Sequence, residues 1–178
     1  MTQRTQVRML TLSALFAAVT AVCAQLIIPI GAVPVSLSLL PVLLCGALLP
    51  PRYAALAMGT YLLMGLAGLP VFSGFGAGPA KLFGVTGGYI LGYLPCALLT
   101  AVMIRRMGRD WRAEAGAMAA GVLVCYAFGT AWFMVTKGTD LRTSLSLCVL
   151  PFLPFDAVKA ALAIALERRL HTIIPQIG

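Results

Sequence analysis

The stretch VRMLTLSALFAAVTAVCAQLII, residues 7–28, is an apolar run long enough to cross a lipid bilayer, which takes about 20 residues as a helix. Arg4 and Arg8 give it a basic start, and AVCA at 21–24 resembles the end of a secretory signal. The apolar residues continue to Ile30, however, beyond the length of a typical signal core. The stretch therefore predicts a first transmembrane helix rather than a cleaved leader.

The composition of the whole chain agrees with a membrane protein. Hydrophobic residues make up 61% of the 178 residues and charged residues only 10%, and the mean hydropathy is +0.98. A soluble domain has about 45–50% apolar and about 25% charged residues. Six spans would use roughly 120 residues, which leaves no room for a soluble domain. We therefore expect one transmembrane domain over residues 1–178, with membrane lipid as its solvent.

Five further apolar runs follow the first, at 39–49, 53–69, 87–104, 115–135 and 145–166. Pro29, Gly31 and Pro34 separate the first two runs, and residues 32–38 alternate apolar and small polar residues, which is typical of an extended segment. That segment is placed to line an outer cavity. Residues 70–84 are rich in glycine and predict a loop. The sequence thus predicts an all-α membrane protein, a bundle of six transmembrane helices.

The basic residues between the runs orient this bundle, because cytoplasmic loops carry an excess of Lys and Arg. With the N-terminus inside, nine arginines lie on the cytoplasmic side: Arg4, Arg8, Arg52, Arg105, Arg106, Arg109, Arg112, Arg168 and Arg169. Three basic residues lie outside: Lys81, Lys137 and Arg142. This predicts an N-in/C-in topology. It also explains the net charge of +8 as a topology signal, so we expect no nucleic-acid partner.

The sixth run contains a carboxylate and an ammonium, Asp156 and Lys159, at a spacing of i, i+3 that puts both on one helix face. Each costs roughly 2.5–3.5 kcal/mol at the centre of a membrane helix. Pro154 fits the first turn of a helix, so we expect the last helix to begin there, with the pair in its outer turns near the extracellular surface. One interpretation is a structural ion pair. We favour a polar anchor for a ligand, because leucine at either position would avoid the desolvation cost.

The glycine-rich loop 70–84 offers a second group of candidate ligand-binding residues: Phe72, Phe75, Gly76 and Gly78. The alternating glycines allow close backbone approach and hinge motion, while the two rings provide apolar contacts. No Gly-Lys-Ser/Thr follows, so the loop is not a phosphate loop. A gating loop and a flexible connector both remain open.

Thr86 and Tyr89 stand where the fourth apolar run begins. The free N–H groups of a helix start, together with these two side chains, are suited to polar ligand atoms. Ordinary helix capping is the alternative.

The first run also carries two pairs of alanines four residues apart, Ala14 with Ala18 and Ala17 with Ala21. Small residues at this spacing let another helix approach closely in lipid. That helix belongs either to this chain or to a partner protein.

Several catalytic functions are excluded by what the sequence lacks. It has no nucleotide-binding motif, and the one histidine, His171, lies beyond Arg169 in the tail. Asp110 and Glu114 lie among arginines rather than in a cluster that would hold a metal. We therefore expect no catalytic residues, metal or cofactor. A membrane-embedded lipid enzyme is the less favoured alternative, and a scaffold would leave Asp156 and Lys159 without a role.

Three motifs occur in order along the chain: GLPVFSGF at 68–75, TGGY at 86–89 and PFDAVK at 154–159. Together with the six spans and the alanine pair of the first helix, they resemble the BioY family of biotin transporters. Members of this family are the substrate-binding S components of energy-coupling factor (ECF) transporters. The resemblance covers nearly the whole chain.

This resemblance implies high-affinity capture of biotin, the transported ligand, in an outward-facing pocket of a multi-pass protein in the bacterial cell (inner) membrane. Asp156 and Lys159 correspond to the paired Asp and Lys of the family's last helix. Ala14 and Ala18 correspond to the surface that faces a transmembrane T component, and ATP hydrolysis would belong to separate ATPase subunits. A solitary transporter of biotin or another vitamin is the alternative.

Overall fold

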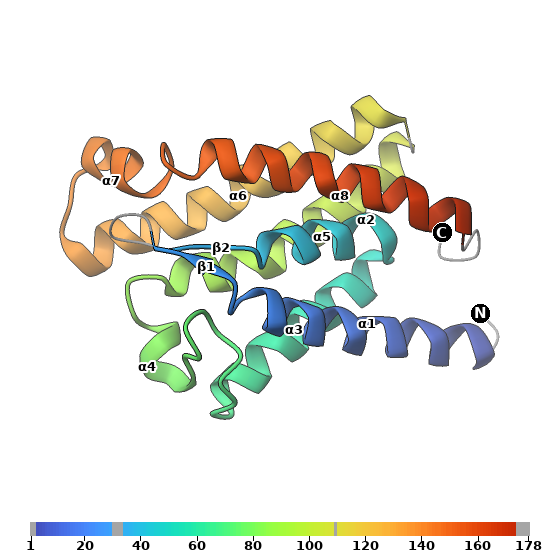
Figure 1. Ribbon diagram of the computed structural model, residues 1–178, viewed down its shortest axis with the longest axis horizontal. Coiled ribbons are helices and arrows are strands. Elements are labelled where there is room, and N and C mark those ends of the chain that lie inside the picture. The colour runs from blue at the N-terminus through green and yellow to red at the C-terminus, as the bar shows by residue number, and fades with distance from the viewer. Residues whose placement is uncertain (1–2, 30–33, 109, 174–178) are drawn as a thin grey trace.

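The computed structural model describes residues 3–29, 34–108 and 110–173, and its helices lie along one long axis (Figure 1). In chain order the elements are α1 (Gln3–Cys23), β1 (Ile27–Ile28), β2 (Val35–Ser36), α2 (Leu39–Leu48), α3 (Pro51–Leu66), α4 (Gly78–Leu82), α5 (Gly87–Met107), α6 (Trp111–Lys137), α7 (Leu141–Cys148) and α8 (Leu153–Ile173). The first residues of α1 and the last of α8 lie at the same end of this axis (Figure 1).

Three of the described helices, α1, α5 and α6, are long and apolar enough to cross a membrane. The pair α7 and α8 forms a fourth candidate span that is bent by 54° at its break. Large apolar side chains face outward on these helices; Val22, Leu123 and Val135 are all more than half exposed. Outward apolar surface on long apolar helices is what lipid requires, so the protein is a multi-pass membrane protein.

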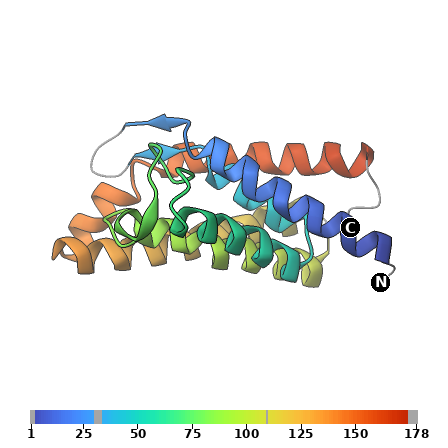
Figure 2. The same ribbon diagram turned by 90° about the horizontal axis from the view of Figure 1, so that it is seen from below.

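Helix α2, of ten residues, lies at the centre of the bundle and contacts α1, α3, α5 and α8. Eight of its ten residues are buried. The hairpin of β1 and β2 extends from α2 toward the end where α4 and α7 lie (Figure 1). Viewed from below, the hairpin lies on the side of α8, with α5 and α6 beneath it (Figure 2). Residues of the hairpin, α5, α6 and α8 line one common cavity, which is described below.

The antiparallel pair α5 and α6 packs closely because glycines lie in its interface. A Cβ at Gly88 would lie 2.2 Å from the Cβ of Trp132, and one at Gly129 would lie 2.2 Å from the ring of Tyr89. In lipid, close backbone approach replaces the hydrophobic effect as a source of helix association. These two contacts fix the α5–α6 wall from which Tyr89 points inward.

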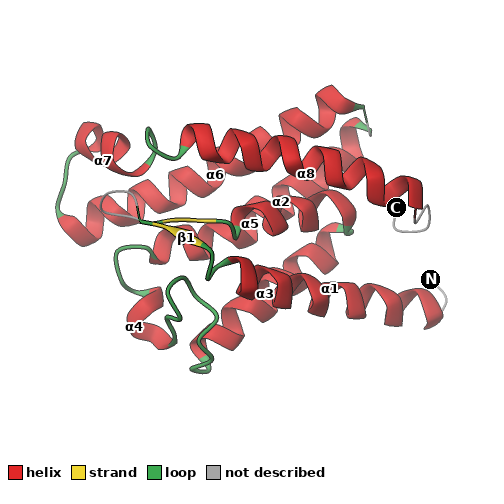
Figure 3. Cartoon of the chain, viewed as in Figure 1, coloured by secondary structure: helices red, strands yellow, loops and turns green. Residues whose placement is uncertain are grey.

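The first helix ends at Cys23, earlier than the apolar run 7–28 predicts. The reason is that Ile27 and Ile28 pair with Ser36 and Val35 in an antiparallel hairpin, so apolar residues beyond the helix are used in a strand. The extended conformation predicted for 32–38 is confirmed at Val35 and Ser36 and is wrong at Leu37 and Ser38, which form the turn into α2, while 32 and 33 lie outside the described residues. The two short strands are the yellow segments of an otherwise helical chain (Figure 3).

Two other sequence predictions are corrected. The stretch 70–84 is not entirely a loop, because Gly78–Leu82 form the short helix α4. The run 145–166 is not one helix, since the chain turns between Cys148 and Leu153. Pro151 and Pro154 lack the N–H groups that would bond one turn back, so the helical ladder is interrupted there. The predicted start of the last helix near Pro154 is confirmed, because α8 begins at Leu153.

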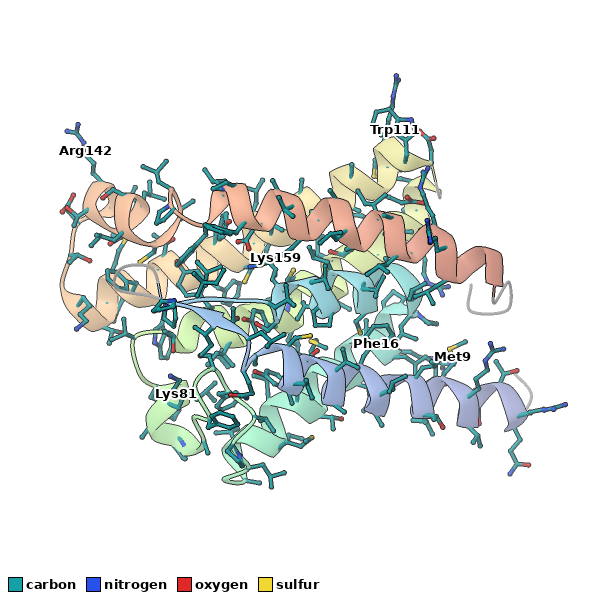
Figure 4. The ribbon with its side chains drawn as sticks, viewed as in Figure 1. Met9, Phe16, Lys81, Trp111, Arg142 and Lys159 are labelled. Carbon is teal, nitrogen blue, oxygen red and sulfur yellow. The ribbon has the colours of Figure 1, made fainter. Side chains whose placement is uncertain are left out.

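Charged side chains lie mainly at the two ends of the bundle. Arg105, Arg106, Arg112, Arg168 and Arg169 are exposed at the ends of α5, α6 and α8 that meet on the side of the two termini. Lys81 and Arg142 lie at the opposite end (Figure 4). There, Asp140 caps α7 by accepting from the Thr143 N–H at 3.2 Å. Hydrogen bonds from Thr143, first from its side chain, lower the pKa of this carboxyl group.

Candidate ligand-binding site

A cavity lies between the hairpin, α5, α6 and α8. Its lining combines apolar and aromatic side chains with a few polar groups. The lining residues are Pro34, Val35, Ser36, Leu39, Ser73, Thr86, Tyr89, Ile90, Tyr93, Cys125, Tyr126, Phe152, Asp156 and Lys159.

The charged groups of this lining form one network. Lys159 Nζ lies 2.6 Å from Asp156 Oδ1, and the Tyr126 hydroxyl donates to Asp156 Oδ2 at 2.6 Å. Both charged residues are buried, with only 7% and 6% of their surfaces exposed. The two interpretations of the pair therefore combine: the charges neutralise each other and also face a cavity. Because each carboxylate oxygen has two lone pairs and the ammonium three donors, both groups keep hydrogen-bonding capacity.

The pair lies deeper than the sequence predicts. Tyr126 belongs to the middle of α6, and its hydrogen bond brings Asp156 to that depth. Figure 4 shows Lys159 near the middle of the long axis, well away from either end. The expectation that the pair lies near the outer surface is wrong, because α7 and the turn after it extend the last span beyond the start of α8.

A chain of hydroxyl groups crosses another wall of the cavity. Ser36 Oγ lies 2.6 Å from Ser38 Oγ, which in turn lies 2.5 Å from the Tyr93 hydroxyl. Hydroxyl groups both donate and accept, so this chain can reverse its direction to suit a ligand. It connects the hairpin to α5, and its two ends, Ser36 and Tyr93, line the cavity.

Thr86 and Tyr89, both predicted as ligand-binding residues, line the cavity. Thr86 precedes α5 but makes no side-chain capping bond, so the capping interpretation is not supported. The Tyr89 hydroxyl donates to the Cys148 carbonyl at 3.1 Å, and its ring packs edge-on against Phe152. Tyr89 therefore holds the α7–α8 turn against α5 while presenting its ring to the cavity.

The four residues predicted from the glycine-rich loop lie outside the cavity lining in this structure. Phe72 is fully buried and packs edge-on against Tyr61, with ring centroids 5.5 Å apart. Phe75 is 71% exposed. Gly76 packs against the stem of Lys81, and Gly78 has a φ of 75° that favours glycine. Their role in ligand binding stays a prediction, and Ser73 is the residue of the loop that lines the cavity.

One side chain, Gln25, ties this loop to the end of α1. Its Nε2 donates to the carbonyl of Phe72 at 3.2 Å and to that of Pro70 at 3.4 Å. Its Oε1 accepts from the Phe75 N–H at 2.8 Å. A primary amide both donates and accepts, so one residue satisfies backbone groups on both sides of the loop tip.

The alanines of α1 divide between two faces. Ala14 and Ala18 are exposed on the outer side, whereas Ala17 is buried against the core. The small-residue spacing thus serves internal packing through Ala17 and leaves Ala14 and Ala18 on an open surface.

Sequence reasoning missed Tyr126, Tyr93 and Gln25. Tyr126 and Tyr93 sit inside apolar runs, where a tyrosine is usually counted as apolar; its polar tip, which needs a partner when buried, was the available signal. Gln25 follows α1 at the end of an apolar run, where an amide has to bond to something. Among the residues that the structure describes, no three His, Cys, Asp or Glu side chains come together as a metal site. The cavity lining combines the buried Asp156–Lys159 pair with aromatic and apolar side chains.

The comparisons with known proteins agree with this geometry. The BioY family model matches residues 1–176. The probable biotin transporter BioY of Pyrococcus horikoshii is 37% identical over 161 residues, covering 90% of this chain and 94% of that protein. The biotin transporter BioY of Thermotoga maritima is 33% identical over 167 residues, covering 93% and 97%.

A solved structure of the S-component for biotin from an ECF-type ABC transporter superposes with a TM-score of 0.91. It is 32% identical to this chain and covers 97% of this chain and 95% of its own. The matches therefore extend over the helices, the hairpin and the cavity alike. This chain belongs to the BioY family.

Proposed function

We propose that this protein captures biotin in the cavity beneath the hairpin and mediates its uptake, as the S component of an ECF transporter. The observation that carries the proposal is the buried pair Asp156 and Lys159, joined to each other and facing a cavity lined by aromatic, apolar and polar side chains. Relatives named biotin transporters support the choice of ligand. The protein is a transport component rather than an enzyme, and it works without a cofactor.

The chemistry of biotin suits the residues of this cavity. Its ureido ring offers two N–H donors and one carbonyl acceptor, its tail ends in a carboxylate, and its thioether ring is apolar. Asp156 accepts from donors, and Lys159 donates to a carbonyl or pairs with a carboxylate. Tyr89, Tyr93 and Phe152 cover the apolar body, while Thr86 and the loop residues Phe72, Phe75, Gly76 and Gly78 belong to the proposed site or its closure.

We further propose six membrane crossings in a single domain, N-in/C-in, in a bacterial cell membrane. The shorter helices α2 and α3 complete the four candidate spans, with the hairpin extending the crossing of α2. The arginines at one end of the bundle support this orientation, since Lys and Arg concentrate in cytoplasmic loops. The first residues of α1 and the last of α8 lie at the arginine-rich end (Figure 1), which supports an even number of crossings.

The proposed partners are a transmembrane T component and ATPase subunits. Support comes from the exposed Ala14 and Ala18 on α1, where small side chains let a second helix pack closely. The relative of known structure is named as part of an ECF-type ABC transporter. The alternative is a solitary carrier, favoured if the reconstituted protein moves biotin without ATP or partner subunits.

Equilibrium binding to the purified protein tests the ligand. Biotin should bind more tightly than thiamine or riboflavin by at least about a hundredfold, roughly 2.7 kcal/mol, since the cavity leaves a mismatched ligand with unpaired polar groups. Biotin methyl ester measures the contribution of the carboxylate, because it lacks the negative charge and keeps the ureido ring. Equal affinity for the three vitamins would contradict the proposal.

A further inference from the structure

A second hollow, the α6–α8 groove, lies on the lipid-facing surface of the bundle, on the other side of Tyr126 and Asp156 from the binding cavity. It is an open groove lined almost entirely by apolar side chains of these two helices. Alanines make up much of both walls: Ala115 and Ala119 on α6, and Ala157, Ala160 and Ala161 on α8. Small side chains on two facing helices leave a furrow that faces lipid in a membrane protein.

The length of the groove matches one leaflet of a bilayer. Its α6 wall runs from Ala115 to Tyr126, which at 1.5 Å per residue spans about 16 Å. One leaflet contributes about half of a hydrocarbon core roughly 30 Å thick. Near the middle of the bundle the groove reaches Tyr126 and Asp156, whose hydrogen bond joins the two helices, and Leu153 one turn further along α8. The groove therefore begins at the arginine-rich end of the bundle and stops near its middle.

The open end of the groove carries positive charge. Arg112 lies one turn before Ala115 on α6, and Arg168 lies one turn after Ile164 on α8. Arg168 Nε donates to Glu114 Oε2 at 3.1 Å, which holds its guanidinium at this mouth. The ends of α5, α6 and α8 that meet here carry the described arginines 105, 106, 112, 168 and 169 against Asp110, Glu114 and Glu167.

Trp111 indicates that the arginine-rich end of the groove lies at the membrane interface. Trp111 is 54% exposed, and the guanidinium of Arg112 lies 5.3 Å from the centre of its ring. Exposed tryptophans of membrane proteins concentrate at the depth of the lipid headgroups. The arginines at the mouth are thus at headgroup depth, where anionic phosphates lie.

We propose that the α6–α8 groove binds one acyl chain of an anionic phospholipid, whose headgroup pairs with Arg112 and Arg168. An acyl chain begins at a headgroup and ends near the midplane, as the groove does. A helix of a second copy or a partner would cross both leaflets, whereas the groove lining extends over only about 16 Å of α6. The bound acyl chain would cover the lipid-facing side of the Tyr126–Asp156 hydrogen bond and shield it from the surrounding lipids.

Native mass spectrometry of the full chain tests this site without using biotin binding. Phosphatidylglycerol and phosphatidylcholine with the same acyl chains are titrated separately. We expect phosphatidylglycerol to bind at least about fivefold more tightly, because each arginine near a membrane surface contributes about 1 kcal/mol toward anionic lipid. Arg112→Gln, which leaves the groove unchanged, should lower this preference by about fivefold.

Filling the groove provides the second arm of the test. Ala119→Leu with Ala161→Leu should weaken phosphatidylglycerol binding by more than about tenfold, since each buried CH₂ of the displaced chain contributes about 0.8 kcal/mol. The matched control is Ala127→Leu with Ala165→Leu, at exposed positions of the same helices outside the groove. Equal binding of both lipids to the unmodified protein, or equal behaviour of the two leucine pairs, would overturn the proposal. So would a shift in oligomeric state confined to the groove-filling pair, which would identify a second copy as the occupant.

Discussion

The Tyr126 hydroxyl donates a hydrogen bond of 2.6 Å to Asp156 Oδ2, joining the middle of α6 to the first turns of α8. The other carboxylate oxygen is held by Lys159 at the same distance. The carboxylate is thus fixed from two helices, and its orientation toward the cavity is set before any ligand enters. Preorganisation of this kind reduces the entropy that binding has to offset.

Tyr126→Phe should weaken biotin binding about tenfold and lower the free energy of unfolding by about 1 kcal/mol. The substitution removes one buried interhelical hydrogen bond, and such bonds contribute about 0.6 kcal/mol on average in membrane proteins, with a maximum near 1.7. Equilibrium binding and thermal unfolding in the same detergent measure the two effects. Tyr53→Phe is the control, because Tyr53 is also buried but lies outside the cavity lining. An unchanged affinity in Tyr126→Phe would show that this bond does not position Asp156.

The ion pair allows stability and binding to be separated. Lys159→Met alone should cost roughly 3–5 kcal/mol of stability, because it leaves a buried carboxylate without its cation. Asp156→Leu combined with Lys159→Met should be less destabilised than Lys159→Met alone, since replacing both charges removes the desolvation cost and leaves only the Tyr126 hydroxyl without its acceptor.

Biotin affinity should respond differently from stability. The double variant should bind biotin at least about a hundredfold more weakly than the original protein. Thermal unfolding and equilibrium binding on the same preparations provide the comparison. A stable double variant that still binds biotin within threefold would assign the pair to structure alone.

The sequence predicted this pair and only part of its surroundings. Spacing i, i+3 and the cost of charge in lipid were sufficient to single out Asp156 and Lys159, because both arguments are local. Ser36, Thr86 and Tyr89 also lie in segments that the sequence placed at the site. Tyr126 and Tyr93 come to the same cavity from segments far apart in the chain, and nothing local in an apolar run specifies which tyrosine faces inward. The early end of α1 was missed for a similar reason: Ile27 and Ile28 are apolar enough for a helix, and their pairing with a later segment decides otherwise.

The glycine contact between α5 and α6 should be intolerant of a methyl group. Gly88→Ala would place a Cβ 2.2 Å from the Cβ of Trp132 and 2.7 Å from the Phe128 carbonyl, so the helices would have to separate. We expect a loss of about 1–3 kcal/mol in the free energy of unfolding, typical of overpacking, measured by thermal unfolding. Gly116→Ala on α6 is the control, because its Cβ would meet nothing within 4 Å and alanine favours a helix. Equal stability of the two variants would mean that the α5–α6 contact is looser than described.

Gln25→Ala should release the tip of the glycine-rich loop. It removes the acceptor for the Phe75 N–H and the donor to the carbonyls of Pro70 and Phe72. We expect hydrogen exchange of the Phe75 amide to quicken at least about tenfold, because a net hydrogen bond contributes about 1 kcal/mol or more when several share one side chain. The dissociation rate of biotin should rise with it if the loop closes the site. Gln6→Ala, at an exposed glutamine of α1, is the control, and unchanged exchange in Gln25→Ala would assign the loop's order to Phe72 packing instead.

Ala14→Leu with Ala18→Leu should abolish co-purification of a T component while leaving biotin binding intact. Both alanines are exposed on α1 and lie apart from the cavity, so larger side chains there would block a close helix approach without disturbing Asp156 or Lys159. The matched control is Ala127→Leu with Ala131→Leu, two exposed alanines at the same spacing on α6. Affinity capture of the tagged chain with co-expressed T and ATPase subunits measures the loss. If both leucine pairs retain the partners, the coupling surface lies elsewhere; if both lose them, the assembly is sensitive to bulk at any lipid-facing position and α1 has no special role.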